Sequence, residues 1–357
     1  MKITFVRPNL YEGRSFDAMH PLCFAILRSL TPPDVTTAFY DERLESIPLD
    51  EPTDLVAMTV ETYTARRAYQ IATSYRRRGV PVVIGGYHPT FLPDEALQFA
   101  DSVVIGDAEG VWSHVIEDAR RGQLRPLYRQ DEFPALGGVM PDRSIFRGKR
   151  YAPVALVQYG RGCKYNCNFC SIRAFYGTVL RQRSVAEVID EIKRCGSRTI
   201  FLVDDNIFVD IPRAVELFEA LIPLRIAWSC QVSIDIAHEP ALVRLMARSG
   251  CINALVGFES LNRDNLVQMR KAWNLKYHDY ETSIRVFQQA GIMIYGTFVF
   301  GYDHDTPASF DEAVAFAIRN KFYLANFNPL TPTPGADLYR QLQQENRLVG
   351  SLFPCRR

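Results

Sequence analysis

The pattern that most constrains the fold is a repeated alternation of short β-rich runs with helical runs. In the first third of the chain the β-rich runs fall at residues 3–6, 35–40, 55–60, 80–84 and 102–105. After the third run, Ala65, Ala68, Tyr69 and Ala72 recur at the spacing of one helical face. Strands that alternate with helices in this way predict an α/β domain with a doubly wound parallel sheet over residues 1–122.

A second alternation follows a segment in which Pro and Gly accumulate, residues 123–152, which we interpret as a linker. Ser184 and Glu187 have the spacing of a capping box at the start of a helix. Six β/α units predict a partial (β/α)6 barrel over residues 153–346, followed by a short tail, 347–357. The β-rich runs of this part are 154–158, 199–203, 227–232, 253–257, 293–300 and 324–328.

Composition narrows the class of protein. The 357 residues include 41 Lys and Arg against 40 Asp and Glu, so no overall field attracts nucleic acid, and we expect no nucleic-acid partner. The sequence has no run of about 18 apolar residues, so it predicts no membrane span. The N-terminus lacks the features of a signal peptide. We therefore expect a cytoplasmic protein. Eight cysteines are too few for a disulfide framework in a chain of this length.

Three of these cysteines are clustered in a loop directly after the first strand of the predicted barrel. Cys163, Cys167 and Cys170 lie within eight residues, behind Gly160 and Gly162. Three thiolates can hold three corners of an iron–sulfur cubane and leave the fourth iron open for a small molecule. A zinc site is the alternative, although it needs a fourth ligand that the sequence does not place nearby. We interpret the other thiols as structural: Cys23, Cys195, Cys230, Cys251 and Cys355.

The spacing Cys-x3-Cys-x-aromatic-Cys, with Phe169 as the aromatic residue, resembles the signature of the radical S-adenosylmethionine (SAM) superfamily. The resemblance implies a four-iron four-sulfur cluster held by the three cysteines. It also implies that the open iron chelates the methionine end of SAM, whose reductive cleavage gives a 5′-deoxyadenosyl radical. An electron donor such as a flavodoxin or a ferredoxin is then needed as a partner.

Residues at the ends of the later barrel strands strengthen the resemblance. For Asp205, which the resemblance implies as a cofactor-binding residue, the alternative role is to cap the start of a helix. The sequence identifies no general acid or base, and Tyr302 and His304, in the loop after the fifth strand, are candidates for a catalytic role. The resemblance implies cofactor-binding roles for Phe169, Asp204, Asp205, Asn206, Gln231, Gly257, Glu259 and Gly301, with Glu259 suited to the ribose diol of SAM.

The N-terminal domain resembles the cobalamin-binding domains that are fused to radical SAM barrels, and its five strands suit a flavodoxin-like order. Its fourth and fifth strands are followed by glycine loops, which let a bulky ligand approach the backbone. The Asp-x-His-x-x-Gly motif of many cobalamin proteins is absent. His88 has two interpretations, a turn residue and a cobalt ligand. The expected cobalamin-binding residues are Gly85, Gly86, His88, Gly106 and Glu109.

Together these features predict a cobalamin-dependent radical SAM enzyme that methylates an unactivated carbon of a small metabolite or lipid precursor. The cofactors carry most of the chemistry, and the protein positions them. A cobalamin-radical cyclase or rearrangement enzyme is the enzymatic alternative. A cobalamin or iron–sulfur sensor, or an electron carrier, is the non-enzymatic one, and a cobalamin fold retained only for packing also stays open.

The mouth of a radical site must be covered to exclude water. Members of the family that the chain resembles commonly continue into a further domain, whereas 22 residues follow Gly335 here. We expect a partner chain or the segment from Arg121 to Pro153 to provide this cover, or else a shortened and less competent form of the enzyme.

Overall fold

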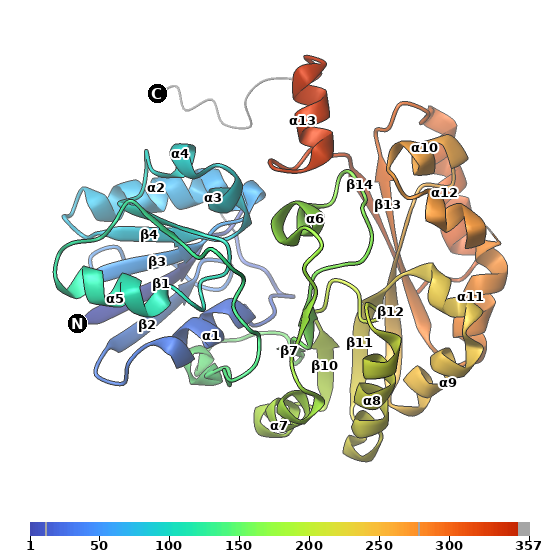
Figure 1. Cartoon of the computed structure of the whole chain (residues 1–357), viewed down its shortest axis with the longest axis horizontal. Helices are drawn as coiled ribbons and strands as arrows, with labels where there is room; N and C mark the ends of the chain where they lie inside the picture. The colour runs from blue at the N-terminus through green and yellow to red at the C-terminus, as the bar shows by residue number, and fades with distance from the viewer. Residues whose placement is uncertain (11–12, 278, 349–357) are drawn as a thin grey trace. The chain divides into compact units, whose positions relative to one another are not determined.

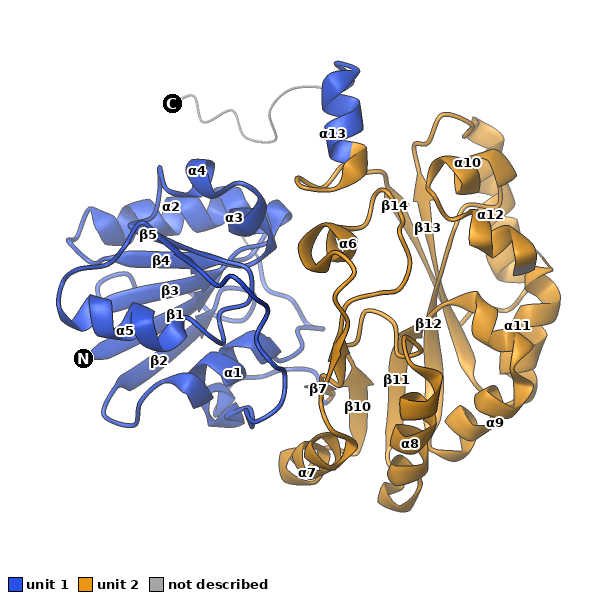
Figure 2. Ribbon diagram, in the orientation of Figure 1, with its two compact units in different colours: residues 1–153, 339–357 blue, residues 154–338 orange. Residues whose placement is uncertain are grey.

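The computed structural model describes residues 1–10, 13–277 and 279–348. Cys355 and most of the expected tail lie outside the described residues. The chain divides into two compact units, one formed by residues 1–153 and 339–357 and the other by residues 154–338 (Figure 2).

Unit 1 contains a six-stranded parallel sheet with the order β2-β1-β3-β4-β5-β6 (Figure 1). The first five strands have the flavodoxin-like order that the sequence predicts. The sixth strand was not predicted, because its three residues lie in the segment interpreted as a linker. The strands are β1 Lys2–Arg7, β2 Thr36–Asp41, β3 Leu55–Thr59, β4 Val82–Gly85, β5 Ser102–Ile105 and β6 Leu127–Arg129.

Helices cover both faces of this sheet because alternate strand residues point to opposite faces. Phe5 of β1 packs in one core with Phe24 and Trp112, whereas the next residue, Val6, packs in the other core with Tyr69. The helices are α1 Leu22–Leu30, α2 Ala65–Arg76, α3 Tyr87–Phe91, α4 Pro93–Ala96 and α5 Trp112–Arg120, with 3-10 turns at Thr62–Thr64 and Arg143–Phe146.

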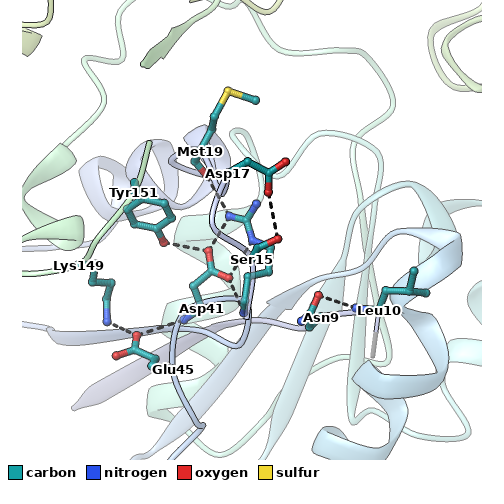
Figure 3. A network of polar contacts seen from close by, with 10 residues as sticks. Asn9, Leu10, Ser15, Asp17, Met19, Asp41, Glu45, Lys149 and Tyr151 are labelled. Atoms are coloured by element: carbon teal, nitrogen blue, oxygen red, sulfur yellow. Dashed lines mark hydrogen bonds and ion pairs between the residues drawn. The ribbon is translucent and has the colours of Figure 1, made fainter. Parts of the chain in front are cut away.

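A buried polar network holds the end of β2 against the end of the 123–152 segment (Figure 3). Asp41 is fully buried. It accepts hydrogen bonds from the Arg43 guanidinium, at 2.6 and 3.0 Å, and from the Tyr151 hydroxyl, at 2.9 Å. Lys149 forms an ion pair with Glu45 beside it. Residues 149–151 are therefore fixed to unit 1.

Unit 2 contains a second six-stranded parallel sheet, with the order β14-β13-β12-β11-β10-β7. Neither edge strand pairs with the other, so the sheet forms the open, partial (β/α)6 barrel that was expected. A two-stranded antiparallel ribbon, β8 with β9, lies outside it. The strands are β7 Ala155–Val157, β8 Gly160–Arg161, β9 Arg181–Gln182, β10 Thr199–Leu202, β11 Ala227–Val232, β12 Cys251–Glu259, β13 Met293–Phe300 and β14 Leu324–Pro329.

One face of this sheet is packed by helices into a single core, in which Trp228, Phe258 and Phe298 are fully buried. The capping box predicted from Ser184 and Glu187 is present at the start of α7. No helix in the described part of the chain is long and apolar enough to cross a membrane. The helices are α6 Ser171–Tyr176, α7 Val185–Cys195, α8 Ile211–Leu221, α9 Pro240–Arg248, α10 Arg263–Gln268, α11 Tyr280–Gln289 and α12 Pro307–Arg319, and α13 Asp337–Gln344 crosses the boundary between the units; 3-10 turns lie at Ile222–Leu224, Ile234–His238 and Ala272–Tyr277.

Candidate active site

The cysteine loop begins at the ribbon strand β8 and ends at the start of α6. Cys163, Cys167 and Cys170 are all free of disulfides and only partly buried. Gly162 has a φ of +99°, and a Cβ there would lie 2.4 Å from the carbonyl oxygen of Val179. Only glycine fits this position, so the turn that presents Cys163 depends on it.

Burial raises the pKa of all three thiols, that of Cys167 to about 12. Cysteines bind metals as thiolates, so metal binding at this loop must release protons. Within the described residues no group of three or more His, Cys, Asp or Glu side chains is arranged to hold a single metal ion. A cubane binds each thiolate at a different iron, so its ligands need not converge on one point. The donor set therefore fits a cluster.

Two predicted site residues, Asp204 and Asp205, hold the backbone of this loop. Asp204 Oδ1 accepts a hydrogen bond from the Tyr159 amide at 2.8 Å, and Asp205 Oδ2 accepts one from the Gly162 amide at 2.7 Å. Burial raises the pKa of Asp204 to about 8. Both carboxyl groups thus serve to position the approach to Cys163, as a cap serves a helix.

Asn206 and Gln231 extend this network of hydrogen bonds. Asn206 donates to the Ser233 hydroxyl at 3.1 Å and accepts from the Phe208 amide at 3.0 Å. Gln231 donates to the carbonyl oxygen of Asp204 at 3.2 Å. The structure therefore brings together the predicted site residues that follow β10, Asp204 and Asn206, with Gln231 at the end of β11.

The end of β12 carries a buried ion pair that includes Glu259, another predicted site residue. Lys271 Nζ lies 3.0 Å from Glu259 Oε1 and donates to the Gly257 carbonyl oxygen at 2.8 Å. A Cβ at position 257 would lie 2.1 Å from Glu259 Oε1, so glycine is needed there. Burial alone would lower the pKa of Lys271, but Glu259 and Cys167 raise it overall. A buried cation thus lies beside the thiols of the cysteine loop.

Asn168, inside the cysteine motif, anchors the loop to three later segments. It is 4% exposed. Its amide group donates to the Gln268 carbonyl at 2.9 Å, and its side-chain oxygen accepts from the Tyr302 hydroxyl at 2.9 Å. Its backbone donates to Met269 and accepts from Leu338. Sequence analysis missed both Asn168 and Lys271. The position of Asn168 between Cys167 and Cys170 could have indicated its role, whereas Lys271 lies outside every motif that the sequence shows.

The loop after β13 contains the two candidates for catalysis. Tyr302 is buried and bound to Asn168, and its ring meets that of Phe169 edge to face with centroids 6.5 Å apart. His304 is exposed, and its backbone amide donates to Asn265. Gly301 has a φ of +124° and donates to Asp305 at 2.7 Å. The structure thus connects Tyr302 to the cysteine loop through its hydroxyl, whereas His304 is held by its backbone.

In unit 1 the glycine loops follow β4 and β5 at the carboxyl edge of the sheet. Gly86 has a φ of +107°, and a Cβ there would lie 2.8 Å from the Val60 carbonyl oxygen. Gly106 has a φ of +80° with open space around it, and Gly85 would meet only Val104. Glu109 is half-buried in the loop after β5. Gly86 thus permits a close approach between two loops of the protein, and Gly106 leaves room for a ligand.

His88 lies in the core rather than at the ligand edge of the sheet. Its side chain is fully buried, and Nε2 lies 3.1 Å from both the Tyr69 hydroxyl and Glu95 Oε1. The same bonds help to hold the pKa of Glu95 below its usual value despite burial. These contacts give His88 a role in packing α3 against α2.

The carboxyl edge of unit 1 also carries an unsatisfied donor. Arg7 Nε, at the end of β1, is buried and has no hydrogen-bond partner among the described side chains and backbone. Burial raises the pKa of the neighbouring Glu61. A corrin ring is surrounded by amide groups that accept hydrogen bonds, so the Arg7 donor and the open space at Gly106 fit cobalamin.

Two family models match the chain, one in each unit. The B12-binding domain matches residues 29–116, and the radical SAM superfamily matches residues 157–317, which include the cysteine loop. The radical SAM domain implies a four-iron four-sulfur cluster and SAM, and the B12-binding domain implies cobalamin. A zinc site in the loop is not supported.

Curated relatives match both units together. A bacteriochlorophyllide d C-12(1)-methyltransferase of Chlorobaculum tepidum is 32% identical over 92% of this chain and 74% of its own length. A C-8(2)-methyltransferase of the same organism is 30% identical over 92% and 77%. An anaerobic magnesium-protoporphyrin IX monomethyl ester cyclase of Rubrivivax gelatinosus is less similar, at 25% identity over 96% and 70%.

Solved structures confirm the arrangement of the fold. The radical SAM methyltransferase TsrM from Kitasatospora setae superposes with a TM-score of 0.76 at 17% identity, over 99% of this chain and 76% of that one. The expected fold class, a flavodoxin-like domain followed by a partial barrel, is therefore confirmed. The chain belongs to the radical SAM superfamily, in the group whose members carry a B12-binding domain ahead of the radical SAM domain.

Proposed function

We propose that the protein is a cobalamin-dependent methyltransferase that methylates an unactivated carbon of a small molecule. The observation that carries this proposal is the match of both units, in one chain, to a methyltransferase at 32% identity. Methyl transfer is favoured over cyclisation because the relative named as a cyclase matches at 25% identity. A sensor or electron carrier is disfavoured because these relatives are named as enzymes.

The residues of unit 2 would hold the iron–sulfur cluster and SAM. Cys163, Cys167 and Cys170 would hold the cluster, with Asp204 and Asp205 fixing the backbone that leads to them. The Lys271 ammonium is the buried cation suited to the methionine carboxylate of SAM. Glu259, fixed by Lys271, is suited to the ribose diol. Residues 153–346 are the proposed extent of this domain.

The first unit would hold cobalamin at the carboxyl edge of its sheet, within residues 1–122. Gly85, Gly106 and Arg7 are the residues whose surroundings support this placement. His88 is left out of the cofactor site because its ring is bonded within the core. When bound, the cluster with SAM supplies a 5′-deoxyadenosyl radical, and cobalamin supplies the methyl group. The protein positions the reactants and excludes water.

The relatives suggest the class of substrate. Both Chlorobaculum tepidum enzymes are named for positions on bacteriochlorophyllide d, a tetrapyrrole. We propose an alkyl carbon of a lipophilic ring as the methyl acceptor, with a lipid precursor as the second choice. A reduced flavodoxin or ferredoxin would deliver the electron, and the protein would work in the cytoplasm.

The test is anaerobic reconstitution with iron, sulfide, cobalamin, SAM and dithionite. We expect one four-iron four-sulfur cluster per chain and release of 5′-deoxyadenosine. Replacement of Cys163, Cys167 or Cys170 with Ala should abolish both, whereas Cys251→Ala, at a thiol buried on β12, should retain them. Full cluster content in Cys163→Ala would show that the loop is assigned wrongly.

Labelled methyl groups distinguish the alternatives. A second SAM would be the source of the methyl group that cobalamin supplies. With methyl-labelled SAM and a tetrapyrrole substrate, the proposal therefore predicts label in the product. A product that forms without label would identify a cyclase or rearrangement enzyme. A protein that yields no 5′-deoxyadenosine under any condition would be a sensor or a carrier.

A further inference from the structure

The two faces of the unit 2 sheet have different surroundings. Side chains on one face are buried against the helices, such as Val157, Leu202, Cys230 and Val256. Most of the alternate residues point to the opposite face, where they stay partly accessible to water. We call this second surface the inner face of the sheet.

Irregularities in the register of β12 place Cys251 and Glu259 opposite Trp228 and Phe298, which belong to the face packed by helices. Apart from these two residues, the inner face carries no charge on its alternating strand positions. It mixes apolar side chains with hydroxyl and amide groups. These positions are Leu156, Thr199, Phe201, Ala227, Ser229, Gln231, Asn253, Leu255, Gly257, Met293, Tyr295, Thr297, Val299, Leu324, Asn326 and Asn328.

Strand register arranges part of this face into one mainly apolar band. Gln231 of β11 lies opposite Leu255 of β12, and Leu255 lies opposite Tyr295 of β13. Tyr295 in turn lies opposite Leu324 of β14. The band starts next to the predicted cofactor residues, since Gln231 is bonded to Asp204, and it continues to the edge of the sheet.

The charged side chains at the carboxyl ends of these strands already have partners within the protein. Glu259 and Lys271 are paired with each other and are both assigned to SAM in the proposed function, and Asp205 accepts from the loop amide of Gly162. A phosphate, phosphonate or carboxylate placed against the inner face would therefore lose water without gaining a partner of opposite charge, which is strongly unfavourable.

We propose that the part of the substrate that lies against the inner face is uncharged and largely apolar, and that any acidic group of the substrate stays outside it. This inference rests on the proposed function and adds the specificity of the same site. Leu255, Tyr295 and Leu324 are the specificity-determining residues. They select a lipophilic ring or chain over a nucleotide or an acidic metabolite.

One neutral donor on the same face suits such a substrate. Asn253 Nδ2 is buried without a hydrogen-bond partner among the described residues. Asn253 lies two residues before Leu255 on β12, at the border of the band. Its neighbours in the strand register are Ser229 of β11 and Met293 of β13. An amide donor without charge fits a carbonyl or ether oxygen of the substrate.

The test uses two probes that share a ring and differ in charge, a chlorin tricarboxylate and its trimethyl ester. Binding to reconstituted holoenzyme is followed by the absorbance of the chlorin, so no turnover is needed. We expect wild type to bind the ester at least about tenfold more tightly than the tricarboxylate. Preference for the tricarboxylate, or binding of neither probe, would overturn the inference.

Charge variants at one position sharpen the test, because only the sign of the charge differs between them. Leu255→Glu and Leu255→Lys should each bind the ester about tenfold more weakly than Leu255→Gln. If an acidic group of the ligand lay on this face, the Lys variant would instead bind the tricarboxylate more tightly and the Glu variant less tightly than the Gln variant. That result would also overturn the inference.

Two controls keep the outcomes separate. The same three substitutions at Leu324, on the edge strand and 44% exposed, disturb the fold less and should give the same pattern. Formation of 5′-deoxyadenosine without substrate reports intact cofactor binding in each variant. Its absence in wild type would contradict the proposed function, while the binding comparison would still decide the charge of the bound group.

Discussion

Lys271 Nζ lies 3.0 Å from Glu259 Oε1, in an ion pair whose side chains are only 8% and 11% exposed. Glu259 has a φ of +64°, an uncommon backbone conformation for a residue with a side chain. The same ammonium donates to the Gly257 carbonyl oxygen. Lys271 therefore holds the end of β12 in the shape that places a carboxylate beside the cysteine loop.

Removal of this cation should destabilise the protein strongly. Lys271→Met leaves the Glu259 carboxylate buried without its partner, which costs about 3–5 kcal/mol. We expect a matching loss in the free energy of unfolding in urea and a loss of SAM binding in calorimetry. Arg270→Met is the control, since the neighbouring Arg270 is 52% exposed and pairs with Asp337 at the surface, where a pair contributes about 0–1 kcal/mol.

The double variant Lys271→Met/Glu259→Gln separates stability from binding. It should recover most of the lost stability, because no buried charge is left unpaired, but it should not recover SAM binding. Equal stability of Lys271→Met and wild type would mean that the pair is not buried in solution.

Asp204 should give the cluster-free protein a distinctive pH dependence. Its pKa is raised from 3.8 to about 8 by burial, so the folded state keeps a proton that the unfolded chain has lost. Stability from this group is fully present below pH 4 and is lost as the pH rises through about 8. Asp204→Asn should remove this slope and unfold at a higher urea concentration than wild type at pH 8. A steeper slope in the variant would contradict the assigned protonation.

Much of the fold was predictable from the sequence because strand and helix patterns are local. The five predicted strands of unit 1 and the six of unit 2 correspond to β1–β5 and to β7 and β10–β14, with ends that shift by a few residues. The cysteine loop was found because its spacing is a local signal as well. Strand β6 was missed because it has three residues, too few to show the alternation of apolar and polar residues that indicates a strand, and it lies in a segment rich in Pro and Gly.

The partners of the site residues could not be predicted, because they come from distant segments. Asp205 follows a strand, as a cofactor ligand would, yet it accepts from an amide 43 positions away. His88 follows a glycine pair at a strand end, yet its ring points into a core formed by Tyr69 and Glu95. Lys271 enters the site from a segment after α10, and only the folded chain places it beside Glu259.

Two glycines in unit 1 should respond differently to the same substitution. Gly86→Ala would place a Cβ 2.8 Å from the Val60 carbonyl oxygen in addition to the cost of its positive φ. Gly106→Ala has only the cost of a side chain at positive φ, because no atom lies within 4 Å of the added Cβ. We expect Gly106→Ala to lose about 1–2 kcal/mol of stability and Gly86→Ala clearly more.

Cobalamin binding tests the same two positions for ligand contact. If the open space at Gly106 accepts the cofactor, the larger Gly106→Trp should lose cobalamin and remain folded by circular dichroism. Unchanged binding in that variant would exclude the loop after β5 from the cofactor site.

A buried network fixes the end of the 123–152 segment to the end of β2 (Figure 3). Asp41 is fully buried and accepts from Arg43 and Tyr151, and the Arg43 guanidinium also donates to the Met19 carbonyl at 2.9 Å. Asp41→Asn removes the charge that balances Arg43 and should cost about 3–5 kcal/mol. Because Tyr151 loses a charged acceptor, the segment around it should become the first site of cleavage in limited proteolysis. Lys149→Met, which removes the partly exposed pair with Glu45, should cost about 1 kcal/mol or less and leave the cleavage pattern unchanged. Equal protection of this segment in Asp41→Asn and wild type would mean that other contacts, such as the packing of Phe146 against Phe39, hold it in place.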